Sequence, residues 1–288
     1  MTNFKRFSLL FALLLATALT AVAQNGAGES KYAKLGANKI HYKSYGKGKD
    51  ALVLVHCWSC NLELWRDHIP ELSKRARVVA LDLPGHGLSD KPETTYSMDF
   101  FADAIDAVMK DAGVEHAVLV GHSMGTPVVR QFYRKYPQKT LGLVIVDGAL
   151  RPFGTKEQRE QFAAPLRGPK YKEAGAQMFA AMSATLSDAE KERIKTSFSN
   201  TPQYVLVSSM DAMGDDAIYT PDKINVPVLA LLAKSPFWPP DTEQFLRSLA
   251  PDLEFEMWEG VSHFLFMDKP KEFNAAVIAF LDKKKLLK

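Results

Sequence analysis

The sequence predicts an α/β fold in which helices cover both faces of a mostly parallel central β-sheet. Short, continuous runs of aliphatic and β-branched residues recur along the chain, as they do in strands that are buried on both faces. Stretches with helical periodicity separate these runs, and Gly, Pro or a charged turn closes each of them. With 47% hydrophobic and 24% charged residues, the 288-residue chain has enough apolar side chains for one large core.

The expected strands and helices follow in chain order. Two short alternating runs, 32–35 and 39–45, predict an antiparallel hairpin that turns at 36–38. Buried strands are expected at 52–55, 78–81, 117–120, 143–146 and 228–232, with a last strand at 254–258. Helices are expected at 63–74, 98–112, 126–136, 241–249 and 270–284.

The alternation of strand and helix stops between Leu150 and Asp222. This stretch is rich in Ala, Met, Gln, Lys and Glu, and it contains no convincing strand pattern. Its helical patterns cover 156–162, 171–185, 188–198 and 202–213. We therefore expect residues 150–222 to form a helical lid that is inserted into a core made of residues 24–149 and 223–288.

The first 23 residues are typical of a secretory signal peptide. Lys5 and Arg6 precede an apolar stretch, and Ala21-Val22-Ala23 forms a small-residue exit. The apolar stretch is shorter than the roughly 18 residues that a membrane span needs, so we expect an exported protein, periplasmic or secreted, with no stable span after cleavage. Without Lys5 and Arg6 the basic residues fall from 36 to 34, against 33 acidic ones. A net charge of +1 argues against nucleic acid as a partner.

The segment Gly121-His122-Ser123-Met124-Gly125 follows an expected buried strand and precedes an expected helix. The pattern Gly-x-Ser-x-Gly in this place is typical of a nucleophile elbow, a strained turn that holds the serine hydroxyl at the carboxyl end of the sheet. Both glycines are needed because a β-carbon would clash with the neighbouring backbone. Ser123 is therefore the candidate nucleophile.

With this motif the chain resembles the α/β-hydrolase superfamily over essentially residues 32–285, and in particular its serine-nucleophile esterases and lipases. Leu81-Asp82-Leu83-Pro84-Gly85-His86-Gly87-Leu88-Ser89-Asp90 also resembles a loop of that family, and Gly260-Val261-Ser262-His263-Phe264 resembles its histidine loop. The resemblance implies the α/β-hydrolase fold. The chemistry has to be argued from the site itself.

A serine hydroxyl is a weak nucleophile at neutral pH and needs a neighbouring imidazole to accept its proton. Among the seven histidines, His263 follows the last expected strand, in the loop where the superfamily's base would lie. His263 is therefore the expected base. We interpret the other histidines as hydrogen-bonded structural residues; they are His41, His56, His68, His86, His116 and His122.

A catalytic triad also needs a carboxylate beside the histidine, and the position of this acid departs from the family pattern. The superfamily usually supplies it from the loop after the next-to-last strand, where this chain has Pro236. Asp147 ends the strand that follows the nucleophile strand, and some superfamily members resemble this arrangement. Asp241 lies five residues after Pro236, in the expected first turn of a helix, where an acid also serves capping and the helix dipole. The sequence favours Asp147 and leaves Asp241 as the alternative.

Attack on an ester creates an oxyanion that needs backbone N–H donors. The amide of Met124, directly after the nucleophile, is one expected donor, and the amide of Trp58 in the loop after the first parallel strand is the other. This loop resembles the family's His-Gly-x loop, with Cys57 in place of the glycine. Cys57 and Cys60 are the only cysteines, and their spacing is compatible with a local disulfide or, less favoured, with a redox motif.

The side chains of Trp58, Phe237 and Trp238 are candidates for lining the substrate pocket. An apolar helical cover over a polar centre predicts a small to medium hydrophobic ester, thioester or lactone as the small-molecule substrate. The sequence has no phosphate-binding glycine loop and no His/Cys ligand cluster, so no cofactor or metal is expected.

The leading hypothesis is an exported, carboxylesterase-like serine hydrolase that forms an acyl-enzyme on Ser123. A perhydrolase, an acyltransferase or a carbon–carbon bond hydrolase would use the same triad. A non-catalytic binding protein on the hydrolase scaffold is the alternative from another class.

Overall fold

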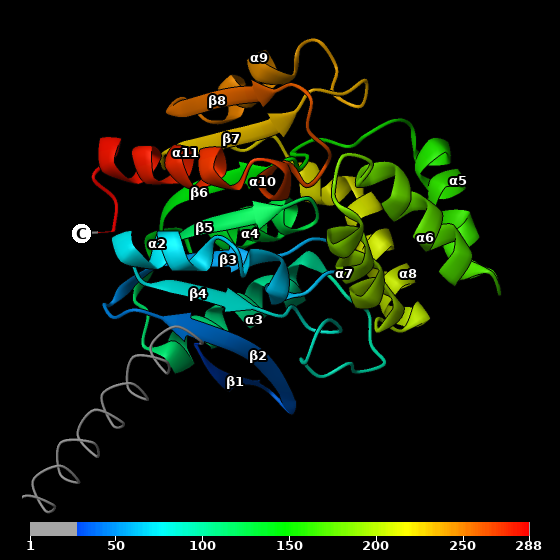
Figure 1. Cartoon of the computed structure of the whole chain (residues 1–288), viewed down its shortest axis with the longest axis horizontal. Helices are drawn as coiled ribbons and strands as arrows, with labels where there is room; N and C mark the ends of the chain where they lie inside the picture. The colour runs from blue at the N-terminus through cyan, green and yellow to red at the C-terminus, as the bar shows by residue number, and fades with distance from the viewer. Residues whose placement is uncertain (1–27, 288) are drawn as a thin grey trace, which may run out of the picture.

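One mixed sheet runs through the structure, a computed structural model that describes residues 28–287. Its eight strands lie in the order β1-β2-β4-β3-β5-β6-β7-β8 (Figure 1). The first two strands are antiparallel to their neighbours, and the six others run parallel to one another. The predicted α/β fold class is therefore confirmed. The expected signal peptide, residues 1–23, lies outside the described residues.

Every predicted strand is present. The strands are β1 (Glu29–Leu35), β2 (Asn38–Tyr45), β3 (Asp50–Val55), β4 (Val78–Leu81), β5 (His116–His122), β6 (Thr140–Val146), β7 (Val228–Ala233) and β8 (Leu253–Trp258). The side chains of β4 and β7 are buried along their whole length, as continuous apolar runs predict for strands with helices on both sides.

The helices pack around the sheet and beyond one end of it. They are α2 (Ile69–Arg75), α3 (Met98–Ala112), α4 (Gly125–Lys135), α5 (Lys156–Arg167), α6 (Tyr171–Met182), α7 (Asp188–Ser199), α8 (Gln203–Gly214), α9 (Thr242–Leu249), α10 (Leu265–Asp268) and α11 (Pro270–Lys283). Three short 3-10 helices join them: η1 (Leu62–Trp65), η2 (Pro137–Lys139) and η3 (Asp216–Tyr219).

The predicted helix at 63–74 is wrong in one respect, because two separate elements occupy this stretch. The 3-10 helix η1 is capped by Asn61, whose side chain accepts from the amide of Glu63. The helix α2 then begins with Pro70 in its first turn. Proline has no N–H and clashes with the preceding turn, so it starts a helix well and continues one poorly. The prediction of a single helix rested on the helical periodicity of the apolar residues, which does not reveal the break between the two elements.

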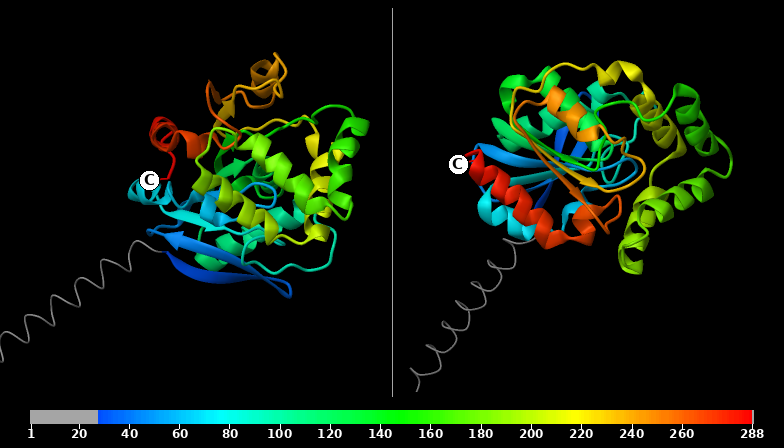
Figure 2. Two further views of the ribbon diagram at one scale, coloured as in Figure 1. Left: turned by 45° about the vertical axis from the view of Figure 1, so that its right-hand side comes forward. Right: turned by 90° about the horizontal axis from the view of Figure 1, so that it is seen from above.

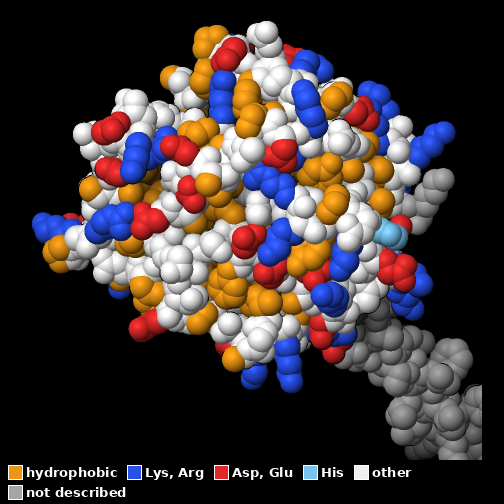
Figure 3. All heavy atoms as spheres, turned by 180° about the vertical axis from the view of Figure 1, so that it is seen from behind, with side chains coloured by type: hydrophobic (Ala, Val, Ile, Leu, Met, Phe, Trp, Pro, Cys, Tyr) orange, Lys and Arg blue, Asp and Glu red, His pale blue; other side chains and the backbone are white. Residues whose placement is uncertain are grey.

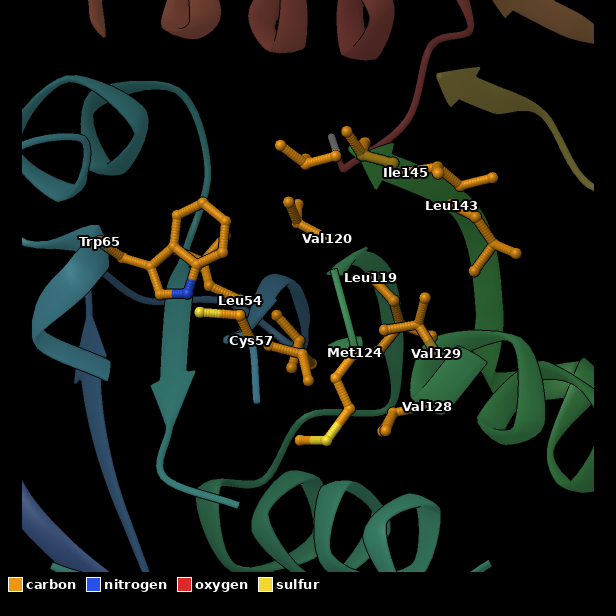
Figure 4. Close-up of a cluster of buried hydrophobic side chains, with 14 of the residues drawn as sticks. Leu54, Cys57, Trp65, Leu119, Val120, Met124, Val128, Val129, Leu143 and Ile145 are labelled. Carbon is orange, nitrogen blue, oxygen red and sulfur yellow. The ribbon is translucent and has the colours of Figure 1, made fainter. Parts of the chain in front are cut away.

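Helices cover both faces of the sheet (Figures 1 and 2). On one face α2 and α11 pack against each other, and on the other face α3 and α4 do so. Figure 4 shows part of the core, in which Leu54 of β3, Leu119 and Val120 of β5, and Met124 and Val128 around the start of α4 are all buried. Each such burial stabilises the fold by roughly 1.5–3 kcal/mol. The strand ends that carry the site are therefore held by the core beneath them.

Four helices, α5 to α8, lie between β6 and β7 in the chain and form a layer beyond the carboxyl ends of the parallel strands (Figure 1). We call Lys156–Gly214 the helical insertion. Its layer remains on the same side of the sheet in both turned views (Figure 2). The helical insertion is therefore placed over the strand ends at which α/β proteins bind ligands.

The surface mixes both signs of charge. On the face shown in Figure 3, lysines and arginines alternate with aspartates and glutamates, and small apolar patches lie between them. None of the helices within residues 28–287 combines the length and the hydropathy that crossing a membrane requires.

Candidate active site

The turn from β5 to α4 has the strained backbone that is expected of a nucleophile elbow, and we call it the elbow. Ser123 has a φ of +54°, in the left-handed region that is strained for a residue with a β-carbon. A β-carbon on Gly121 would lie 2.4 Å from the carbonyl oxygen of Gly125, and one on Gly125 would lie 2.6 Å from that of Val55. The amide of Ser123 donates to the carbonyl of Val146 at 3.0 Å. The elbow is therefore fixed against the ends of both neighbouring strands, β3 and β6.

Asp147 directly follows β6 and is almost completely buried, with 7% of its side chain exposed. Its Oδ2 accepts from Nδ1 of His263 at 2.6 Å. Its Oδ1 accepts from the amide of Ala233 at 2.8 Å and from the indole N–H of Trp238 at 3.1 Å. Because Nδ1 of His263 carries the proton that faces Asp147, Nε2 is left with the lone pair that a general base needs.

His263 lies beside the elbow. The ring centroids of His122 and His263 are 4.8 Å apart, and Nε2 of His122 donates to the backbone carbonyl of His263 at 2.9 Å. Within residues 28–287, Nδ1 of His263 is bonded to Asp147, while its Nε2 forms no hydrogen bond. The structure thus brings the three predicted triad residues, Ser123, His263 and Asp147, to one edge of the sheet.

Asp241, the alternative acid, is not in contact with His263. Both of its oxygens accept from the guanidinium of Arg151, at 2.7 and 3.0 Å, on the surface. The hydrogen bond from Arg151 lowers the pKa of the Asp241 carboxyl. The structure therefore places Asp241 in an exposed ion pair at the start of α9 and places Asp147 at the histidine.

The two predicted oxyanion donors lie at adjoining backbone turns. The amides of Trp58 and Met124 donate to no group within residues 28–287. A β-carbon on Gly125 would lie 3.0 Å from the carbonyl oxygen of His56, so the start of α4 packs directly on the loop that carries Trp58. Free amides at a helix N-terminus attract negative charge. The amide of Met124, at the start of α4, is therefore available to an anion, and the amide of Trp58 in the adjoining turn is also free of an internal partner within residues 28–287.

The loop that carries Trp58 is closed by a disulfide between Cys57 and Cys60. Both cysteines are buried, and the amide of Cys60 donates to the carbonyl of Cys57 at 3.2 Å. Ser59, inside the disulfide, has a φ of +54°. A short covalent ring leaves such a loop few alternative conformations, so the disulfide restrains the backbone at the Trp58 amide.

The three aromatic side chains that were predicted to line the pocket lie in different surroundings. Trp58 is buried and stacks on Phe179 of α6, with ring centroids 5.8 Å apart. Trp238 donates to Asp147, as described above. Phe237 is 51% exposed and lies beside Phe153, with centroids 5.5 Å apart. Sequence reasoning missed the bond from Trp238 to the acid, because nothing in the local pattern around Trp238 indicates it.

The helical insertion is hydrogen-bonded to the loop that carries Trp58, which we call the oxyanion loop after its predicted role, and to the loop that carries His263. The indole of Trp58 donates to the carbonyl of Leu206 in α8 at 3.0 Å, and Ser197 in α7 donates to the carbonyl of Ser59 at 3.0 Å. The amide of His263 donates to the carbonyl of Met182, the last residue of α6, at 3.1 Å. The helical insertion therefore helps to fix the backbone of the predicted base and of the oxyanion loop.

Three fully buried histidines, His56, His86 and His122, are not among the predicted catalytic residues. Burial lowers the pKa of His56, lowers that of His86 to about 3, and lowers that of His122 well below its ordinary value. Nδ1 of His56 donates to the carbonyl of Cys57, and its Nε2 accepts from the amide of Leu83. These histidines are therefore neutral and act as hydrogen-bonding groups at neutral pH.

A groove of about 1090 Å³ lies elsewhere, between α8 and the segment that precedes α3. Thr95, Gln131, Tyr204 and Asp211 are among the residues that line it. None of the predicted site residues does. We therefore locate the candidate site by the strand ends and their hydrogen bonds.

The chain is similar to known proteins over most of its length. The family described as alpha/beta hydrolase fold matches residues 50–270. An uncharacterised protein of Mycobacterium tuberculosis is 27% identical over 262 residues, which cover 81% of this chain and 75% of the relative. The pimeloyl-[acyl-carrier protein] methyl ester esterase of Edwardsiella ictaluri is 37% identical over 107 residues, which cover 37% of this chain and 40% of the relative.

A solved structure is similar over most of the chain. Est816, described as an N-acyl homoserine lactone degrading enzyme, superposes with a TM-score of 0.73 at 26% identity, covering 86% of this chain and 99% of its own. The family match spans most of the described residues and includes Ser123, Asp147 and His263. The chain therefore belongs to the alpha/beta hydrolase fold family and is a hydrolase of that family.

Proposed function

We propose that the protein is a serine hydrolase that cleaves a small to medium hydrophobic carboxylic ester or lactone through an acyl-enzyme on Ser123. The observation that carries this proposal is the hydrogen bond of 2.6 Å between His263 and the buried Asp147, at the same sheet edge as the elbow. In the neutral imidazole this bond places the proton on Nδ1 and leaves Nε2 free to accept a proton from serine.

In the first half of the reaction, Ser123 Oγ attacks the substrate's carbonyl carbon while its proton moves to Nε2 of His263. The tetrahedral intermediate carries its negative charge on the former carbonyl oxygen, facing the amides of Trp58 and Met124. When the bond to the leaving oxygen breaks, Nε2 returns the proton to that oxygen. The products are an alcohol and an acyl-Ser123 ester.

In the second half, water replaces the alcohol. His263 accepts a proton from the water as it attacks the acyl carbon, and then gives that proton to Ser123 Oγ as the acid leaves. Asp147 stays ionised and stabilises the imidazolium in both halves. The free Nε2 fits this cycle, because catalytic hydrogen bonds to the nucleophile often tighten only when substrate is bound.

Two observations support an ester or lactone as the substrate. The relatives reported above include a methyl ester esterase and an enzyme described as degrading an N-acyl homoserine lactone, and both of the named substrates contain an acyl–oxygen bond. The helical insertion places apolar rings close to the oxyanion loop, since Phe179 and Phe198 both contact Trp58. An apolar cover over a polar centre suits a hydrophobic acyl group.

An extracytoplasmic location is part of the proposal. The first 23 residues have the pattern of a secretory signal peptide, and a disulfide such as Cys57–Cys60 persists in oxidising compartments. Fractionation of cells that express the full chain tests this. Recovery of the shortened protein outside the cytoplasm is expected, and recovery of the uncleaved chain in the cytoplasm contradicts it.

The experiment that tests the function is hydrolysis of a p-nitrophenyl ester series, from acetate to decanoate, by the protein and its Ser123→Ala variant. We expect turnover that depends on acyl length and that the substitution abolishes. A fluorophosphonate probe, which reacts with activated serines, is expected to label the protein and to leave the variant unlabelled. No turnover together with no labelling contradicts the proposal and favours a binding protein on the hydrolase scaffold.

A further inference from the structure

His122, the residue before the nucleophile, is one of the fully buried side chains of the molecule. It belongs to β5 and makes one hydrogen bond, from Nε2 to the backbone carbonyl of His263 at 2.9 Å. A carbonyl oxygen only accepts, so Nε2 of His122 carries the proton. Its other ring nitrogen, Nδ1, is buried and has no partner within residues 28–287.

The catalytic histidine is held at three points. Asp147 holds Nδ1 of its ring, and the carbonyl of Met182 in the helical insertion holds its amide. His122 holds its carbonyl. Of these three contacts, only the one from His122 starts on the nucleophile elbow itself, one residue before Ser123. The side chain of His122 therefore links the backbone of His263 to the elbow, at the residue that precedes Ser123.

We propose that His122 is a positioning residue, which sets the distance between Ser123 Oγ and Nε2 of His263 through its hydrogen bond to the His263 carbonyl. This inference rests on the proposed serine hydrolase function. The distance matters because a misplacement of about 1 Å in a catalytic contact costs roughly 100-fold in rate. The proposal means that His122, which is as fully buried as a purely structural histidine, still affects the rate of the reaction.

The surroundings of His122 explain why a neutral histidine suits this place. Its ring contacts the rings of Phe264 and Phe266 as well as that of His263, with centroids 5.2, 4.8 and 4.8 Å away, respectively. An apolar pocket disfavours the charged form of His122 and leaves Nδ1 as an unprotonated acceptor. A neutral His122 places no positive charge next to the imidazolium that forms on His263 during catalysis.

The chain offers a matched control in His68. This histidine is also fully buried, makes one side-chain hydrogen bond, to Asn274, and has one ring nitrogen without a partner within residues 28–287. It even contacts the same ring, that of Phe266, with centroids 5.4 Å apart. His68 has no contact with Ser123 or His263 among its hydrogen bonds and ring contacts. Substituting the two histidines alike separates catalytic positioning from general core stability.

The test compares four variants: His122→Phe, His122→Gln, His122→Asn and His68→Phe. Each is checked for folding by circular dichroism and thermal unfolding, then assayed for kcat and KM with p-nitrophenyl acetate and for the rate of fluorophosphonate labelling. Gln places an amide N–H near the position of Nε2, whereas Asn is too short and Phe has no donor. The pair Gln and Asn keeps the test informative if His122→Phe does not fold.

We expect His122→Phe and His122→Asn to lower kcat and the labelling rate by about 10- to 100-fold while the fold is retained. His122→Gln is expected to recover most of the rate that His122→Asn loses. His68→Phe is expected to lower the midpoint of thermal unfolding and to leave kcat unchanged.

A folded His122→Asn variant with the original kcat and labelling rate would overturn the inference. So would an equal loss of kcat in His68→Phe, because the effect would then reflect core stability. If the unmodified protein neither hydrolyses p-nitrophenyl acetate nor reacts with the probe, the serine hydrolase function fails instead, and the two failures are thereby told apart.

Discussion

The loops that follow β6 and β7 lie side by side at the carboxyl edge of the sheet, and each contains or precedes a carboxylate. After β6, Asp147 is buried and accepts three hydrogen bonds. After β7, Asp241 is exposed and faces only the guanidinium of Arg151 among its side-chain partners. The loop after β7, which carries the acid in most of the superfamily that the chain resembles, here supplies donors to an acid on the neighbouring strand.

The difference between the two loops shows what makes a carboxylate useful to a histidine. Fixed donors hold Asp147 in one orientation, and burial keeps water from competing for its oxygens. Asp241 carries the same charge, but solvent screens it and its partner is a flexible arginine. A carboxylate is therefore suited to hold a histidine when it lies in a rigid, desolvated site. An acid that merely lies in the expected loop is not enough.

The largest effect is expected from Asp147→Asn. The amide group of asparagine can donate to Nδ1 of His263, which moves the imidazole proton to Nε2 and removes the base. We expect kcat for p-nitrophenyl acetate to fall about 10³- to 10⁴-fold, with the fold retained by circular dichroism. Steady-state kinetics measures this. If the variant keeps more than a tenth of the activity, a residue other than Asp147 is the acid, and the contrast between the two loops does not hold.

A smaller loss is expected from Trp238→Phe, which keeps an aromatic ring and removes the N–H that faces Asp147. A hydrogen bond to a charged group contributes about 1.5–3 kcal/mol, and the amide of Ala233 still holds the same oxygen. We therefore expect a loss of about tenfold in kcat.

Trp258→Phe is the matched control for this substitution. The indole of Trp258 also donates to a carboxylate, that of Glu256 at 2.8 Å, but does so on the exposed strand β8. Its substitution is expected to leave kcat unchanged. Equal losses in the two variants would show that an indole N–H has no special role at Asp147.

A third loop, after β3, extends the comparison, because a covalent bond restrains it. Reduction of Cys57–Cys60 is expected to lower kcat several-fold, since the amide of Trp58 then has more conformations available. Thiol titration and circular dichroism accompany the assay. The variant Cys57→Ala/Cys60→Ala controls for direct effects of the reductant and is expected to be insensitive to it. Full activity with both thiols titrated as free contradicts the role of the disulfide.

The sequence predicted those features that depend on residues close together in the chain. Gly121, Ser123 and Gly125 encode the elbow within five positions, and continuous apolar runs mark the buried strands. The sequence predicted one helix at 63–74 and missed the break within it. Pro70 marks the start of the second element, α2, where a proline fits well.

The contacts that complete the site are long-range. The bond from Trp238 to Asp147 joins residues 91 positions apart, and the bond from His122 to His263 joins residues 141 apart. No local pattern marks either pair, because each depends on how two loops of the folded sheet face each other. Asp147 was a candidate because it ends a strand, whereas its hydrogen-bond partners became visible only in the folded chain.

The smallest effect is expected from Asp241→Asn, which removes the charge that faces Arg151. Arg151 also lies over the ring of Phe245, 4.7 Å from its centroid, and keeps that contact without the carboxylate. An exposed ion pair contributes little to stability, and none of its atoms touches His263. We therefore expect kcat within about twofold of the original, which steady-state kinetics alongside Asp147→Asn measures. A loss comparable to that of Asp147→Asn would mean that the loop after β7 reaches the histidine when substrate is bound, and that the two loops exchange roles during the reaction.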